Sequence, residues 1–95
     1  MKVLTKCVDI ENERFVLIKD QCEVKGKMIH YIGTIPYTEL DSKGCMKRPL
    51  NGFEMCIGDT IPEALERRMD EIKTRNMNET QLIQYFQSKL SRDCQ

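Results

Sequence analysis

Apolar and polar residues follow two different periods along the 95-residue chain. In the first half the apolar runs are short, as at residues 15–18, or alternate with polar residues, as at residues 27–35. Both patterns are typical of β-strands, because successive side chains on a strand point to opposite faces. In the second half apolar residues recur at the spacing of one helix face. The pattern therefore predicts strands followed by helices.

Two amphipathic helices are predicted, over residues 60–75 and 79–92. Asp59 or Thr60 can cap the first helix, Pro62 suits its first turn, and Asn78 can cap the second. Their apolar stripes consist of Ile61, Leu65, Met69 and Ile72 in the first helix and Leu82, Ile83, Phe86 and Leu90 in the second. Because a helix of this length is marginal alone, we expect an antiparallel pair with Phe86 buried against Leu65 or Met69.

The strands are predicted at residues 3–10, 14–19 and 27–35, with a hairpin turn at Lys25-Gly26. Two weaker strands are predicted at residues 45–50 and 53–57, joined by a second hairpin turn at Asn51-Gly52. The fold class is therefore α+β, an N-terminal antiparallel β-meander of short strands followed by the helix pair. Residues 1–52 form the meander and residues 53–95 the last strand and the helices, unless the whole chain is one domain.

The charges balance to a formal net charge of zero, with 15 Lys and Arg against 15 Asp and Glu. Residues 1–52 hold nine basic and seven acidic residues, and residues 53–95 hold six basic and eight acidic ones. Neither half is the basic block that is typical of a nucleic-acid-binding segment. Acidic and basic residues interleave along the first helix, which indicates a solvated face with paired charges. They are Glu63, Glu66, Arg67, Arg68, Asp70, Glu71 and Lys73.

The five cysteines are odd in number, none forms a C-x-x-C pair, and no secretory signal precedes them. We therefore expect a cytoplasmic protein with five free thiols and no membrane segment. Structural zinc sites usually bring ligands in close pairs, and His30 is the only histidine, so no metal site is predicted. No phosphate-binding glycine loop or other cofactor motif is present in the sequence. Because no nucleophile has a base at a recognised spacing, we predict that the chain is not an enzyme.

The second half resembles the ribbon-helix-helix DNA-binding repressors over residues 55–92. The resemblance is carried by Ile61-Pro62 after a short predicted strand, by Leu65 and Met69-Asp70 in the first helix, and by Leu82-Ile83 in the second. The resemblance implies a homodimeric transcriptional regulator, in which paired strands of two copies enter the major groove of duplex DNA.

The resemblance also implies which residues would contact DNA. Cys56, Gly58 and Thr60 would face the bases from the strand, and Asn78 and Thr80 would offer the start of the second helix to a phosphate. The preceding loop would add phosphate contacts from Lys43, Lys47 and Arg48.

The alternative is a non-catalytic, single-domain α+β protein that acts in protein–protein interaction or oligomerisation. On this interpretation the helices cover one face of the sheet, and the partner is another copy of the chain or another protein. The partner of residues 53–57 separates the two hypotheses. Pairing within the chain favours an interaction protein, and pairing between two copies favours the ribbon.

Overall fold

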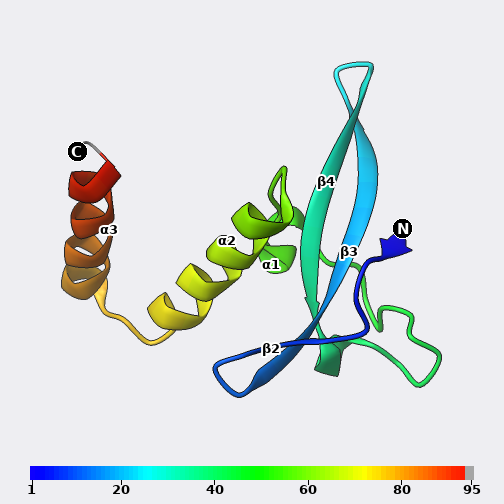
Figure 1. Ribbon diagram of the computed structural model, residues 1–95, viewed down its shortest axis with the longest axis horizontal. Helices are drawn as coiled ribbons and strands as arrows, with labels where there is room; N and C mark the ends of the chain where they lie inside the picture. Colours follow the sequence, from blue (N-terminus) through cyan, green and yellow to red (C-terminus); the bar gives the residue numbers. More distant parts are fainter. Residues whose placement is uncertain (94–95) are drawn as a thin grey trace.

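The computed structural model describes residues 1–93 and shows an α+β protein with a four-stranded antiparallel sheet followed by helices (Figure 1). The strands are β1 (Lys2–Val3), β2 (Val8–Ile10), β3 (Glu13–Val24) and β4 (Lys27–Pro36). A 3-10 turn, η1 (Tyr37–Glu39), follows the sheet, and the α-helices are α1 (Gly52–Met55), α2 (Ile61–Thr74) and α3 (Glu79–Asp93). The predicted fold class is confirmed at this level.

The long strand β3 is the centre of the sheet. On one side β4 pairs with it from Phe15↔Pro36 to Val24↔Lys27. On the other side β2 and β1 pair with successive parts of it. The prediction of one strand over residues 3–10 was wrong, because the Leu17 carbonyl accepts hydrogen bonds from the amides of both Leu4 and Thr5. Residues 4–7 lie opposite only residues 16–17, and these two extra residues interrupt the edge strand and divide it into β1 and β2.

Tight turns join β2 to β3 and β3 to β4. Lys25 and Gly26 both have positive φ, 50° and 79°, as a two-residue turn matched to the strand twist requires. The hairpin predicted there is confirmed. It carries β3 and β4 beyond the rest of the sheet as a projecting arm (Figure 1), on which Val24, Met28 and Ile29 are exposed.

The alternation along β3 divides the core into two clusters, one on each face of the sheet. Val16 and Ile18 pack with Ile35 and with Met55 of α1. Leu17 packs on the other face with Ile32 and with Ala64 of α2. The short helix α1 thus covers one face and α2 covers the other.

Residues 53–57 do not form the predicted strand, and Asn51-Gly52 is not a hairpin turn. Asn51 caps α1 instead: its side chain accepts from the Glu54 amide at 2.8 Å, and the Glu54 carboxylate accepts from the Asn51 amide at 3.4 Å. Cys56 then ends the helix in the left-handed conformation, with φ 51°. Asparagine serves both roles, and here the reciprocal capping box prevails over the hairpin.

Residues 45–50 do not form the predicted strand either. A single bridge, Leu40↔Met46, is the β-pairing that the structure gives this segment within the described residues. Pro49 lacks the N–H that a strand ladder requires. The segment is a loop between η1 and α1, and Met46 and Leu50 pack onto the Val16 cluster.

Helix α2 begins as predicted, because the Thr60 hydroxyl accepts from the Glu63 amide and Pro62 lies in the first turn. Its buried face was predicted wrongly. Ala64 and Arg68 are the buried residues, whereas Met69 of the predicted stripe is exposed. The face is rotated because Gly58 pairs with Ile32 through two 2.8 Å hydrogen bonds and brings the start of α2 onto β4.

Gly58 is required at this position, since a Cβ there would lie 2.9 Å from the Ala64 nitrogen. The residue therefore fixes how closely α2 can approach the sheet.

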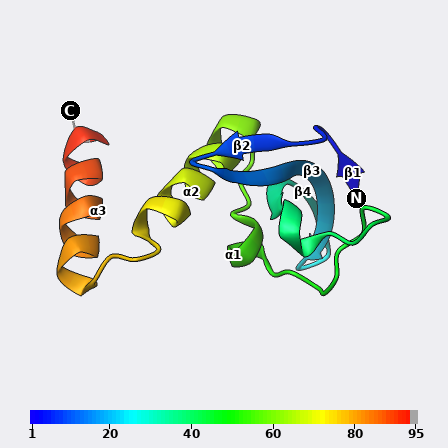
Figure 2. The ribbon, with the colours of Figure 1, turned by 90° about the horizontal axis from the view of Figure 1, so that it is seen from below.

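Helix α3 begins at the predicted residue, where the Asn78 and Gln81 side chains each accept from the other's amide. The predicted packing of the pair was wrong. Figures 1 and 2 show α3 diverging from the far end of α2 and standing away from the sheet. Phe86 is 45% exposed instead of buried against Leu65 or Met69. Leu65 does not pack against Phe86, because it packs on the Leu17 cluster of the sheet.

Candidate functional site

A buried arginine joins the three layers of the molecule. Arg68 of α2 is only 3% exposed, and its guanidinium lies 4.7 Å from the centre of the Phe15 ring. It donates to the Thr34 hydroxyl at 2.8 Å, to the Thr34 carbonyl at 3.0 Å and to the Glu54 carbonyl at 2.6 Å. The Thr34 hydroxyl in turn donates to the Met55 carbonyl at 2.9 Å. These bonds fasten α1 and α2 to β4.

The prediction that Arg68 lies on a solvated helix face was therefore wrong, while Arg67 and Glu63 do form an exposed pair at 2.7 Å. No feature of residue type distinguishes the two neighbouring arginines. Only their position around the helix axis relative to the sheet does so.

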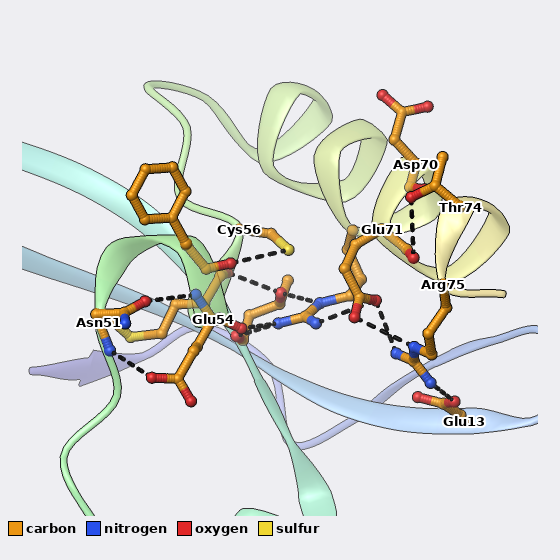
Figure 3. A network of polar contacts seen from close by, with 12 residues as sticks. Glu13, Asn51, Glu54, Cys56, Asp70, Glu71, Thr74 and Arg75 are labelled. Carbon is orange, nitrogen blue, oxygen red and sulfur yellow. Dashed lines mark hydrogen bonds and ion pairs between the residues drawn. The ribbon is translucent and has the colours of Figure 1, made fainter. Parts of the chain in front are cut away.

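The charges continue from Arg68 along α2 to the start of β3 (Figure 3). The Glu71 carboxylate lies 3.6 Å from Arg68 and 2.7 Å from Arg75, and Arg75 also pairs with Glu13. The hydrogen bonds from Arg75 to Glu71 and Glu13 raise the pKa of its guanidinium. Each of these charged groups is paired with a group of opposite charge, so the cluster stabilises the fold by holding α2 to the start of β3.

An apolar recess of about 680 Å³ lies beside α1. Phe53 is 94% exposed at its edge, which is unusual for an aromatic side chain in a small domain. The recess is lined by Asn51, Gly52, Phe53, Cys56, Ile57 and Arg67. Burial raises the pKa of the Cys56 thiol, and the thiol donates to the Phe53 carbonyl at 3.7 Å. The recess is therefore suited to apolar contact.

A second exposed apolar surface follows one side of α3. Ile83, Phe86 and Leu90 lie in this stripe, and each keeps close to half of its surface exposed or more. We call these three residues the α3 stripe. Their spacing of three and four residues places them on a single face of the helix.

The α3 stripe remains open because α3 meets α2 through a polar cluster beside it. The Tyr85 hydroxyl donates to Asp70 at 2.6 Å, Lys89 pairs with the same carboxylate, and Lys89 also lies 3.4 Å from Glu66. Partial burial pushes the pKa of Asp70 upward, but the hydrogen bonds from Lys89 and Tyr85 outweigh it, so that pKa is lowered. The hydrogen bond to Asp70 raises the pKa of Lys89.

The residues expected to contact the bases of DNA have structural roles within the chain. Cys56 is buried at the end of α1, Gly58 is bonded to Ile32, and the Thr60 hydroxyl caps α2. The ribbon that the resemblance implies requires an extended segment here. In the structure Gly52–Met55 form the helix α1, and Gly58 pairs with Ile32 of its own chain in an isolated bridge.

The residues expected to contact phosphate lie in two separate places (Figure 1). Lys43, Lys47 and Arg48 lie in the loop before α1, whereas Asn78 and Thr80 lie at the start of α3. Arg48 pairs with Glu54 at 2.6 Å and with Glu39 at 3.3 Å, so its charge is compensated. Asn78 caps its own helix, while Lys43, Lys47 and Thr80 are exposed.

Chemical groups that could bind a metal do not converge in residues 1–93, where no three His, Cys, Asp or Glu side chains are grouped suitably. His30 is exposed on the projecting arm. Cys7, Cys22, Cys45 and Cys56 are free thiols, and Cys94 lies outside the described residues. Among the described helices, none has the length and apolar character that crossing a membrane requires.

Comparison of the chain with protein-family models, with curated proteins and with solved structures gave no match. Function is therefore inferred from the surfaces of this structure.

Two of those surfaces were not recognised in the sequence. The sequence did contain a signal for α1, which forms the recess at Phe53, because Asn51-x-x-Glu54 is a capping-box pattern that predicts a helix start. No sequence signal predicted the exposure of the α3 stripe, because two helices that pack within one chain have the same apolar spacing.

Proposed function

We propose that this chain is a non-catalytic oligomerisation module that forms a homodimer through α3. One observation carries the proposal: Ile83, Phe86 and Leu90 form a continuous stripe and are 51%, 45% and 62% exposed. Burying a side chain of this size is worth about 1.5–3 kcal/mol. A partner that covers the stripe would therefore gain a substantial hydrophobic contribution.

The stability of α3 itself supports the same proposal. An isolated helix of 15 residues is marginal in water, and α3 stands away from the sheet (Figure 2). The polar contacts at Asp70 hold only one side of it. Packing against a second helix would supply apolar burial that the described residues of the chain do not give the α3 stripe.

The charges favour a second copy as the partner. Residues 80–88 contain no charged side chain, although charged residues make up 32% of the sequence. Two copies of this segment can therefore approach without like-charge repulsion. One helix contact is smaller than the usual interface of about 800 Å² per partner, so we expect a micromolar dissociation constant.

Sedimentation equilibrium tests the proposal with variants matched for residue type. At concentrations well above the dissociation constant the unmodified chain should approach twice the monomer mass, and Phe86→Ser should shift it to the monomer. Phe53→Ser is the control, because Phe53 is the more exposed phenylalanine but lies on α1. The proposal fails if the unmodified chain is a monomer, or if the two variants dissociate equally.

A second candidate function is the binding of another protein at the Phe53 recess. The observation that favours it is the 94% exposed phenylalanine beside an apolar hollow, since exposed aromatic residues beside pockets are typical interaction anchors. Peptides selected by display against the chain should carry an apolar anchor, shift the NMR signals of Gly52 and Ile57, and lose affinity for Phe53→Ser. Peptides that bind this variant equally well would exclude the recess.

A further inference from the structure

We propose that this chain binds a small aliphatic carboxylate in a pocket between β1 and the loop that follows η1. The pocket measures about 260 Å³ and lies on the face of the sheet that α1 partly covers. Its lining shares no residue with the Phe53 recess or with the α3 stripe. The site is therefore independent of the proposed homodimer.

The inner end of the pocket is apolar. Val16, Ile18 and Ile35 line it, and all three belong to the core cluster on this face of the sheet, where they are 5% exposed or less. An apolar cavity of about 150 Å³ holds one benzene molecule, so this pocket has room for roughly eight to ten carbon atoms. Its interior therefore suits a short hydrocarbon chain.

The two walls of the pocket are already ordered by hydrogen bonds. On one side Val3 belongs to β1, where it pairs with Ile18 of β3. On the other side Leu40 forms a bridge with Met46, and the Asp41 carboxylate accepts from two amides of the same loop at 2.8 and 3.0 Å. A ligand that enters between these walls has little of the chain to order, which lowers the entropic cost of binding.

The charge at the pocket favours an anion. Lys6 is exposed and lines the pocket, and within residues 1–93 its ammonium forms no ion pair. The described lining contains no Asp or Glu, and the carboxylate of Asp41 in the adjacent loop is bonded to its own amides. A hydrocarbon chain that carries one carboxylate matches both properties, because the chain leaves water while the carboxylate stays solvated beside Lys6.

Titration of the intact chain with octanoate, followed by methyl NMR spectroscopy, tests the site. The methyl signals of Val16, Ile18 and Ile35 should shift and saturate, with a dissociation constant on the order of 1 mM for a ligand of this size. Octylammonium has a chain of the same length and the opposite charge, so it should bind more weakly at low salt. Absence of saturable shifts at these methyl groups, or shifts confined to the α3 stripe or the Phe53 recess, would overturn the proposal.

The variant Val3→Trp tests the location of the ligand. Val3 is 51% exposed, so a larger side chain there fills the pocket from its outer edge and should abolish the methyl shifts. Val24→Trp is the matched control, because Val24 is a valine of similar exposure, 45%, on the projecting arm. Octanoate binding that is equally strong in both variants would overturn the assignment of this pocket.

The variant Lys6→Gln tests the class of ligand. It should raise the dissociation constant for octanoate about two- to fivefold at low salt, the effect of one exposed ion pair, and the difference should disappear as salt screens the charges. Lys27→Gln removes an exposed lysine at the tip of the projecting arm and should have no effect. An unchanged octanoate affinity in Lys6→Gln at low salt, or equal binding of octanoate and octylammonium by the unmodified chain, would overturn the assignment of a carboxylate.

Discussion

Replacement of Arg68 by alanine should be among the most destabilising single substitutions in the chain. Its side chain is 3% exposed and makes three hydrogen bonds, to the Thr34 hydroxyl and to the Thr34 and Glu54 carbonyls. Arg68→Ala removes all three donors together with the contact over the Phe15 ring. The acceptors then remain inside the protein without their partner, which is the costly way to break such a group.

The magnitude follows from these contacts. A hydrogen bond to a charged group contributes about 1.5–3 kcal/mol, but bonds from one side chain are not additive, and water can enter part of the space. Removing one member of a buried charged cluster typically costs about 3–5 kcal/mol, and we adopt this range for Arg68→Ala. A domain of this size has a total stability of about 5–15 kcal/mol, so the variant should be only marginally folded.

Urea denaturation followed by far-UV circular dichroism measures the free energy of unfolding. Arg67→Ala is the matched control, because Arg67 is the neighbouring arginine on the exposed side of α2, and its loss should cost about 1 kcal/mol or less. Arg68→Met keeps most of the volume without the donors and should cost about 1–3 kcal/mol through the unpaired carbonyls. An equal loss of unfolding free energy in the Arg67 and Arg68 alanine variants would refute the claim that Arg68 holds α1 and α2 to β4.

The other predictions concern α3, the thiols and DNA. The lowered pKa of Asp70 means that its contribution to stability is complete above the ordinary value of 3.8 and is lost as the pH falls through the folded value. The protection of α3 amides relative to their intrinsic exchange rates should therefore fall on acidification below 3.8, and Asp70→Asn should lower it at neutral pH. Exchange in α3 that is indifferent to this substitution would show that the polar cluster does not hold the helix. In the native Cys94→Ser variant, a thiol reagent should modify Cys7, Cys22 and Cys45 rapidly and Cys56 slowly, because Cys56 is buried and its pKa is raised; four equal rates would contradict this. Duplex DNA should not bind at low salt, because Arg48 is paired and the net charge is zero; salt-dependent binding that Lys47→Ala weakens would restore the regulator hypothesis.

Local patterns were sufficient to predict the elements with strong local signals. The hairpin at Lys25-Gly26 and the starts of α2 and α3 all depend on turn and capping chemistry within a few residues. The apolar run at residues 15–18 identified the central strand, because both of its faces are covered.

Where a segment suits two different structures, local patterns could not determine which one it would adopt. Asn51-Gly52 suits a hairpin turn, whereas Asn51 with Glu54 suits a helix cap, and the helix is also held by Arg68 of α2, which donates to the Glu54 carbonyl. The buried face of α2 depends in the same way on the close approach at Gly58. The hydrogen bond from Arg68 to Glu54 and the pairing of Gly58 with Ile32 are tertiary contacts, and the local pattern of apolar residues does not specify them.

The candidate site was less predictable than the fold. The apolar side chains of the α3 stripe were identified, but they were assigned to packing within the chain. Leu65 cannot serve both the sheet and α3, and in the structure it packs on the sheet. The same residues therefore become the proposed contact between copies.

Hydrogen–deuterium exchange of the intact chain as a function of protein concentration tests the central proposal most directly. If a second copy covers the α3 stripe, amides of residues 80–90 should become more protected as concentration rises through the micromolar range, while amides of β3 should not change. Protection in α3 that is the same at every concentration, in a chain that sediments as a monomer throughout, would contradict the proposed dimer.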